Sequence, residues 1–158
     1  MSWVGHINYA VEQAIVAYLR SFTLSGVNYQ QIYPGMGKGD TDLYGGVQFS
    51  DEPGQTLPCV KVIADNWDCP LEPDQGVYRV NARIEVWSNA DDTATSDHNT
   101  RAGEIFDAFT QTGVNAGISA QATDFTLQFM RRMSGGYRIE DRAWVSFLNL
   151  EMIVNPND

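Results

Sequence analysis

The sequence has few cysteines, few basic residues and no long apolar run, and each shortage excludes a class of protein. Cys59 and Cys69 are too few for a disulfide scaffold or, without added histidines, for a structural zinc site, so we expect two buried thiols. No apolar run approaches the about 20 residues that span a bilayer, and we expect no membrane partner. The first residues, MSWVGHINYA, lack the basic and apolar regions of a signal peptide, which predicts synthesis in the cytoplasm.

Acidic residues outnumber basic ones by 20 to 10, which gives a formal net charge of -10. Phosphate binding needs clustered cations, so a chain this acidic should not bind nucleic acid broadly. An acidic surface can still lie beside DNA, repel it and let it slide. The basic cluster of Arg131, Arg132, Arg138 and Arg142 is either a solvated hairpin face that pairs with local acids or a docking patch for an acidic neighbour.

Apolar spacing predicts a single α+β domain that covers residues 1–158. From about Val4 to Phe22 an i, i+3, i+4, i+7 stripe is typical of a helix, and Glu12 falls on its solvated face. Residues 77–88 alternate with a period of two, which indicates a strand with one face on a core. The core-facing residues of this strand are Val80, Ala82, Ile84 and Val86.

A second helix is expected after the polar segment 89–92. Its buried stripe consists of His98, Ala102, Ile105 and Phe109. Asp91 or Asp92 is the expected N-cap, because a carboxylate accepts hydrogen bonds from the free N–H groups at a helix start. Since His98 lies on the apolar stripe, we expect a buried helix histidine rather than a general base.

Four further segments complete the predicted sheet. They are Val27–Tyr33, which Pro34 ends, then Cys59–Trp67, Phe125–Met133 and Ala143–Val154. The residues Ser134-Gly135-Gly136 are expected to break the third of these strands, whose odd-numbered residues share one face. Residues 113–123 are small and polar, and we expect a connection there. The order of elements predicts a mostly antiparallel sheet packed on one face by two helices.

A long loop rich in Gly, Asp and Pro is predicted at about residues 34–57. This segment is not expected to bind phosphate, because Lys38 precedes Gly39 where a phosphate loop needs Ser or Thr. A calcium loop is also not expected, because Tyr44 stands where its third ligand is needed. A loop this long in a small domain is often functional, and an arm that reaches a neighbouring subunit is one use for it. The candidate interface residues are Lys38, Asp40, Asp42, Tyr44, Arg131, Arg132 and Arg138.

No converging nucleophile, base and oxyanion donor can be named, so we expect no enzyme, no catalytic residue, no cofactor and no metal. Instead, four segments taken in order resemble the tail terminator and tail completion proteins of tailed bacteriophages. They are VEQAIVAYL, LPCVKV, VYRVNARIEVWS and NADDTATSDHNTRAGEIFDAF, and they cover about residues 4–109. The segment from Ala90 to His98 is the most recognisable, and the strand start at Leu57-Pro58-Cys59-Val60 is the second.

The resemblance implies a homo-oligomeric ring, usually a hexamer, that caps the tail tube in the neck of the virion. Its implied partners are other copies of itself, the tail tube protein and a head-completion or connector protein. Genomic DNA would pass through the lumen without specific binding. The alternatives are another head–tail connector of a tailed phage, a small hydrolase acting in phage assembly, or a monomeric prophage-derived binding module.

Overall fold

The computed structural model describes residues 7–22, 32–34, 58–69, 76–91, 93–140 and 143–157. Its elements are α1 (Ile7–Arg20), β1 (Ile32–Pro34), β2 (Cys59–Asp68), β3 (Tyr78–Asn89), α3 (Thr95–Asp107), α4 (Val114–Gln121), β4 (Phe125–Glu140) and β5 (Ala143–Pro156). Within these residues, no helix is both long and apolar enough to cross a membrane. Most of the predicted loop at about 34–57 and the start of the predicted strand at Val27 lie outside the described residues.

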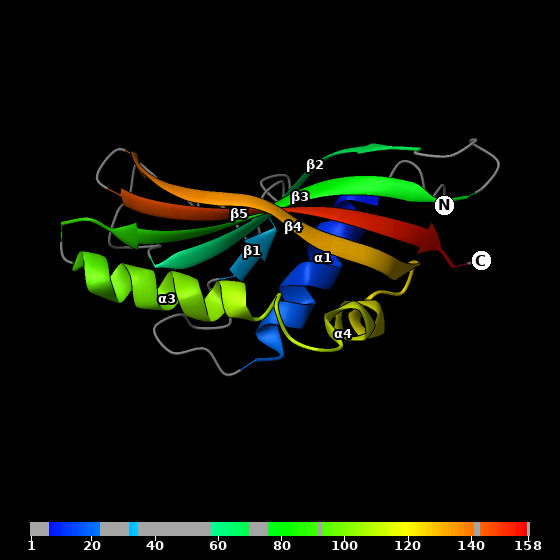
Figure 1. Cartoon of the computed structure of the whole chain (residues 1–158), viewed down its shortest axis with the longest axis horizontal. Helices are drawn as coiled ribbons and strands as arrows, with labels where there is room; N and C mark the ends of the chain where they lie inside the picture. The colour runs from blue at the N-terminus through cyan, green and yellow to red at the C-terminus, as the bar shows by residue number, and fades with distance from the viewer. Residues whose placement is uncertain are drawn as a thin grey trace, which may run out of the picture.

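The strands form a five-stranded sheet in the order β1-β2-β3-β5-β4. Only β1 runs parallel to its neighbour, and the other neighbouring pairs are antiparallel. The helices α1, α3 and α4 lie along one face of this sheet (Figure 1). The predicted α+β class with a mostly antiparallel sheet is therefore confirmed.

The main core lies between this sheet face and the helices. The predicted inward residues Val80, Ala82, Ile84 and Val86 of β3 are all buried, as are Leu150, Met152 and Val154 of β5. They meet an apolar stripe on α1 that includes Val11, Ile15 and Leu19. Alternation on the strands and the helical stripe both located this core correctly, since each follows directly from backbone geometry.

A third helix, α4, occupies residues that we expected to form a connection. It contains the residues VNAGISAQ, of which only Ile118 is buried, so its apolar pattern is too weak to mark a helix in the sequence. Short helices depend on tertiary packing, and here α1 supplies it. A Cβ atom added at Gly117 would lie 2.7 Å from Cε1 of Tyr18, so α4 approaches α1 at its glycine. The Tyr18 hydroxyl, whose pKa is raised by burial, donates to the carbonyl of Ala108 at 2.6 Å.

The expected acid cap of the second helix is wrong for Asp91. α3 begins at Thr95 with Ala94 as its N-cap, and among the described residues no side-chain hydrogen bond caps this end. The Asp91 N–H instead donates to the side-chain oxygen of Asn89 at 2.9 Å, so Asp91 belongs to the turn after β3. Asp92 lies outside the described residues.

β4 continues through the residues that we expected to break it. Glycine fits here because Phe147 of β5 lies close on both faces of the strand: a Cβ atom added at Gly136 would be 3.0 Å from Cζ of the Phe147 ring, and one added at Gly135 would be 3.0 Å from the backbone oxygen of Phe147. Interior strand glycines commonly mark such close approaches. A bulge between Leu127 and Phe129 also ends the expected shared face, so that Leu127 is buried whereas Phe129 is exposed.

Two bulges lie on one row of the sheet. One falls between Ala64 and Asn66 of β2, and the other falls between Arg132 and Ser134 of β4. The pairings Ala64–Ala82, Ala82–Leu150 and Leu150–Arg132 connect them across the strands between. Because each bulge bends its strand and increases the local twist, we expect the bend and twist of the sheet to be greatest along this row.

Glu12 of α1 holds the first of these bulges, which corrects its expected solvated position. The side chain is fully buried, and its Oε2 accepts a hydrogen bond of 2.8 Å from the backbone N–H of Ala64. A bulge leaves backbone groups without their usual ladder partners, and the carboxylate serves one of them. Helical periodicity could not predict this contact, because the acceptor site is created by β2.

Two helix glycines provide a test of the contact between α1 and α4. Gly117→Ala should lower the free energy of unfolding by about 1–3 kcal/mol, because the methyl group collides with Tyr18. Gly103→Ala in α3, where the added Cβ atom meets nothing within 4 Å, should instead raise it by up to about 1 kcal/mol. Urea denaturation of both variants checks this. Equal effects of the two substitutions would contradict the packing of α4.

Candidate functional site

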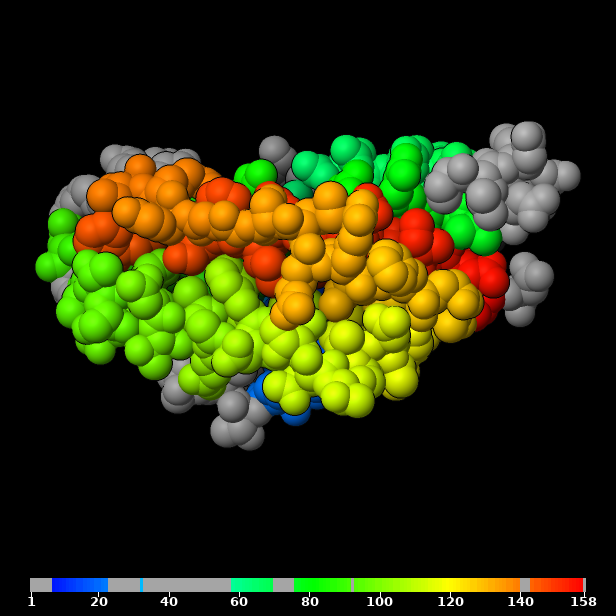
Figure 2. Space-filling model, in the orientation of Figure 1, coloured from blue at the N-terminus to red at the C-terminus, as the bar shows by residue number. Residues whose placement is uncertain are grey.

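Four of the six large apolar side chains that are exposed among the described residues lie on β4, and the other two are Tyr9 and Trp67. Phe129 is 48% exposed, Met133 50%, Tyr137 75% and Ile139 63%. β4 pairs with β5 along one edge, and among the described residues no strand pairs with its other edge. Figure 2 shows it as a continuous orange ridge across the front of the molecule. A long exposed edge strand with large apolar side chains is a typical contact surface for another chain.

The candidate interface arginines all lie on β4, but on different sides of it. Arg131 and Arg138 are paired with Glu151 and Val145 of β5, on the helix-free side of the sheet. Arg132 is exposed and pairs with Leu150, whose side chain lies in the core, so Arg132 is on the helix-bearing side. The other predicted interface residues, Lys38, Asp40, Asp42 and Tyr44, lie outside the described residues, as does Arg142.

The helix-free face carries a buried carboxylate, although only the opposite face of this strand was expected to lie on a core. Glu85 of β3 is 3% exposed. Its Oε1 accepts a 3.1 Å hydrogen bond from Nε1 of Trp87, and its Oε2 lies 3.6 Å from Nη1 of Arg83 and 3.5 Å from Nη2 of Arg138. Since β5 lies between β3 and β4, the contact with Arg138 reaches across a whole strand. Glu85 therefore links the edge strand β4 to the central strand β3 through an ion pair.

Polar pairs continue along the same face. Arg79 and Asp68 form two hydrogen bonds of 2.6 and 2.9 Å, and Arg79 holds the pKa of the Asp68 carboxyl below its usual value. Arg131 donates to Glu151 at 3.1 Å. The Arg83 guanidinium lies 5.0 Å from the centre of the Phe147 ring. Together with Lys61, half of the ten basic residues of this acidic chain lie on one sheet face.

A second, smaller core also lies on this face. It consists of Cys59, Trp87, Ala143 and Val145, all buried. The Arg138 guanidinium lies 5.9 Å from the Trp87 ring centre, above this cluster. Burial raises the pKa of the Cys59 thiol, so it stays protonated and unreactive at neutral pH. Cys59 and Cys69 are both free thiols. Cys59 is buried, as expected, whereas Cys69 is only half-buried because it lies just after the end of β2.

His98 connects α3 to the sheet. It is 3% exposed, with Nδ1 2.8 Å from Oγ of Ser88 and Nε2 2.9 Å from Oγ of Ser146. Arg101 donates to the Ser88 hydroxyl oxygen, so the Ser88 O–H can donate to Nδ1 and leave Nε2–H to donate to Ser146. Burial, and then the nearby charge of Arg101, lowers the pKa of His98 to about 4. The imidazole is neutral and buried at pH 7, as a structural histidine should be.

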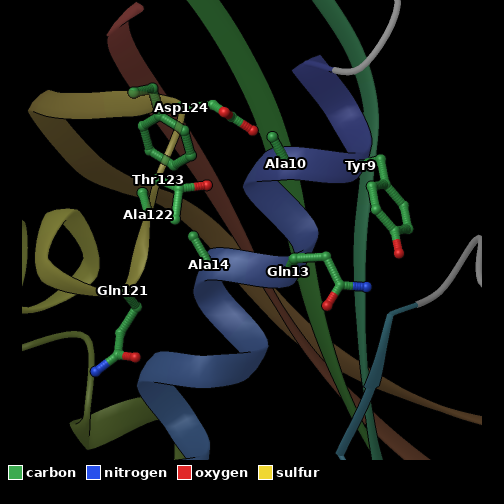
Figure 3. A pocket seen from close by; sticks show the side chains of 9 residues that line it. Tyr9, Ala10, Gln13, Ala14, Gln121, Ala122, Thr123 and Asp124 are labelled. Carbon is green, nitrogen blue, oxygen red and sulfur yellow. The ribbon is translucent and has the colours of Figure 1, made fainter. Parts of the chain in front are cut away.

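A groove of about 350 Å³ lies between α1 and the segment that joins α4 to β4. Figure 3 shows Ala10 and Ala14 of α1 facing Ala122 and Thr123. The small side chains leave the hollow, and the lining is mainly apolar. Such a groove fits an apolar side chain better than a charged ligand. No sequence pattern indicated this groove, because its second wall follows the unexpected helix α4.

These features include one surface that is suited to contacts with other macromolecules. Among the described residues, no group of three or more His, Cys, Asp or Glu side chains is placed to hold a metal ion. The β4 ridge, by contrast, combines exposed apolar side chains with arginines. Neither the models of known protein families nor the curated proteins contain a match to this chain.

Two glutamates on the helix-free face test whether a buried ion pair contributes more to stability than an exposed one. Glu85→Gln should lower the free energy of unfolding by about 1–3 kcal/mol, because it removes the charge that two guanidiniums face. Glu151→Gln should cost about 0–1 kcal/mol, since its partner Arg131 is 55% exposed. Chemical denaturation at neutral pH measures both. A larger loss for Glu151→Gln would contradict the role given to Glu85.

His98 should make stability depend on pH. Its folded pKa of about 4 lies below the unfolded value of about 6.5, so protons bind the unfolded chain more tightly. The contribution of the neutral, buried His98 to the free energy of unfolding is fully present above pH 6.5 and should fall by about 2–3 kcal/mol as the pH drops towards 4. Denaturation at pH 7 and pH 4.5 measures this change. His98→Gln should show a smaller difference between the two pH values, and an unchanged difference would exclude His98 as the cause.

Proposed function

We propose that this chain is a tail terminator of a tailed bacteriophage, a ring-forming structural subunit that caps the tail tube. The observation that carries the proposal is the order and spacing of the four sequence segments that resemble this class of protein. In the structure these segments fall on α1, the start of β2, β3, and the β3–α3 unit. They therefore belong to one core rather than to separate parts of the chain.

Surface properties of the chain also support the proposal. A ring subunit needs large contact surfaces on its sides, and β4 presents an exposed strand with four large apolar side chains. A lumen that lets DNA pass must not hold it, and a chain with a net charge of -10 suits that requirement. Neither property requires a catalytic group.

The proposed mechanism is geometric. A head-to-tail contact closes into a ring when the rotation between neighbours completes a full turn. One face of such a ring binds the last layer of tail tube protein. The opposite face differs from that of a tube subunit, so no further layer is added, and a head-completion or connector protein binds there instead. The protein would reside in the neck of the virion after assembly in the host cytoplasm.

A polymerisation assay tests the proposal. The tail tube protein of the same virus is polymerised with and without this chain, and tube lengths are measured by negative-stain electron microscopy. We expect shorter tubes with a ring at one end when the chain is present, because a capped end adds no further layer. Native mass spectrometry of the chain alone should show a hexamer that images as a ring. Unchanged tube lengths with bare ends would overturn the proposal.

A further inference from the structure

The outer edge of β4 is unusually open for a strand of its length. β4 has 16 residues, and from Gln128 to Ile139 all are exposed except the half-buried Met130 and Arg138. The exposed residues lie on both sides of the sheet, so neither the helices nor the other described strands cover this part of β4. Proteins normally cover or shorten such edges because unpaired strands attract other chains.

The charge of β4 limits which chain can contact it. Arg131, Arg132 and Arg138 make it a basic strand in a strongly acidic protein. Two copies that met through β4 alone, around a two-fold axis, would bring these three arginines towards their equivalents. Like charges on facing strands destabilise the contact. The charge therefore favours a different, acidic surface as the partner of β4.

The opposite end of the same sheet offers such a surface. β1 covers only residues 60–62 of β2, and no described strand pairs with the outer edge beyond them. Asp65, Asn66, Trp67 and Asp68 are all exposed there. Trp67 packs edge-to-face against Tyr78, with ring centres 5.5 Å apart, which leaves part of its ring on the surface. This acidic edge, residues 65–68, thus combines two carboxylates with an exposed aromatic ring.

We propose that β4 of one copy docks against the acidic edge, Asp65–Asp68, of the next copy. The exposed apolar side chains of β4 would bury against Trp67, and Arg132 would face Asp65, whose carboxylate makes no ion pair with another described residue. Figure 1 shows β4 in front of the sheet and β2 behind it. Two different surfaces at opposite ends of one subunit form a head-to-tail contact. This inference names the side contact of the ring, and it rests on the proposed function for the closure of that ring.

Two charge reversals test the pairing of these edges. Arg132→Glu would place a second carboxylate opposite Asp65, and Asp65→Lys would place a second cation opposite Arg132, so each variant alone should associate at least tenfold more weakly than the wild type. An equimolar mixture of the two variants should recover assembly, because each reversed side chain can then meet one of opposite charge on the other variant. Native mass spectrometry of the mixture should show equal numbers of each variant in every assembled species.

A matched control separates this effect from net charge. Asp107→Lys makes the same change of charge as Asp65→Lys at an exposed position of α3, and it should assemble as the wild type does. Thermal unfolding of each variant checks that the fold is kept. A contact between two β4 strands would leave Asp65→Lys assembled, and the mixture would stop at dimers. Either result overturns the inference.

The outcomes also separate this inference from the proposed function. If the wild type forms a ring that neither reversal weakens, the ring stands and the edge contact is wrong. If the wild type stays monomeric up to its solubility limit, the edge contact is wrong, and the tube-length assay still decides whether the chain caps tubes. If the mixture assembles in alternation but tube lengths do not change, the edge contact stands and the tail terminator proposal falls.

Discussion

The burial of β3 on both faces is the constraint on which the rest of the structure depends. From Ile84 to Ser88 every residue of this central strand is buried. The apolar side of β3 faces the helices. Its polar side carries Glu85, which is buried away from water, and a buried carboxylate needs hydrogen bonds or opposite charges to offset its lost hydration. Arg83, Trp87 and Arg138 provide them. The helices thus cover one face of β3, and arginines of β3 and of the edge strand β4 lie beside the carboxylate that is buried on its other face.

Sequence patterns located the parts of this fold that depend on local periodicity. The stripe of α1 and the alternation of β3 and β5 follow from backbone geometry, so they could be predicted from neighbouring residues alone. The misses have a common cause. Glu12, Glu85 and Gly117 owe their roles to strands or helices distant in the sequence, and no local pattern records such contacts.

Only part of the exposed β4 surface could be predicted, again because local patterns are visible in the sequence and long-range contacts are not. Arg131, Arg132 and Arg138 are close together in the sequence, so their clustering was visible without a structure. The exposed apolar residues of β4 were not, because a bulge at Gln128 turns Phe129 out of the core and Gly135-Gly136 suggested a break. Bulges and charges on an edge strand discourage indiscriminate pairing. On β4 the three arginines would favour partners whose surface carries the opposite charge.

The aligned bulges of β2 and β4 have a consequence for assembly geometry. Each bulge bends its strand, and the Glu12 carboxylate binds the backbone beside one of them from the core side, so the bulges would contribute to the angle between the two ends of the sheet. In an assembly built through these ends, that angle would contribute to the turn from each subunit to the next. Surface side chains would then control how tightly neighbours bind, whereas the extra residue in each bulged strand would control how many neighbours complete the circle. Affinity and stoichiometry would be encoded separately in the same strands.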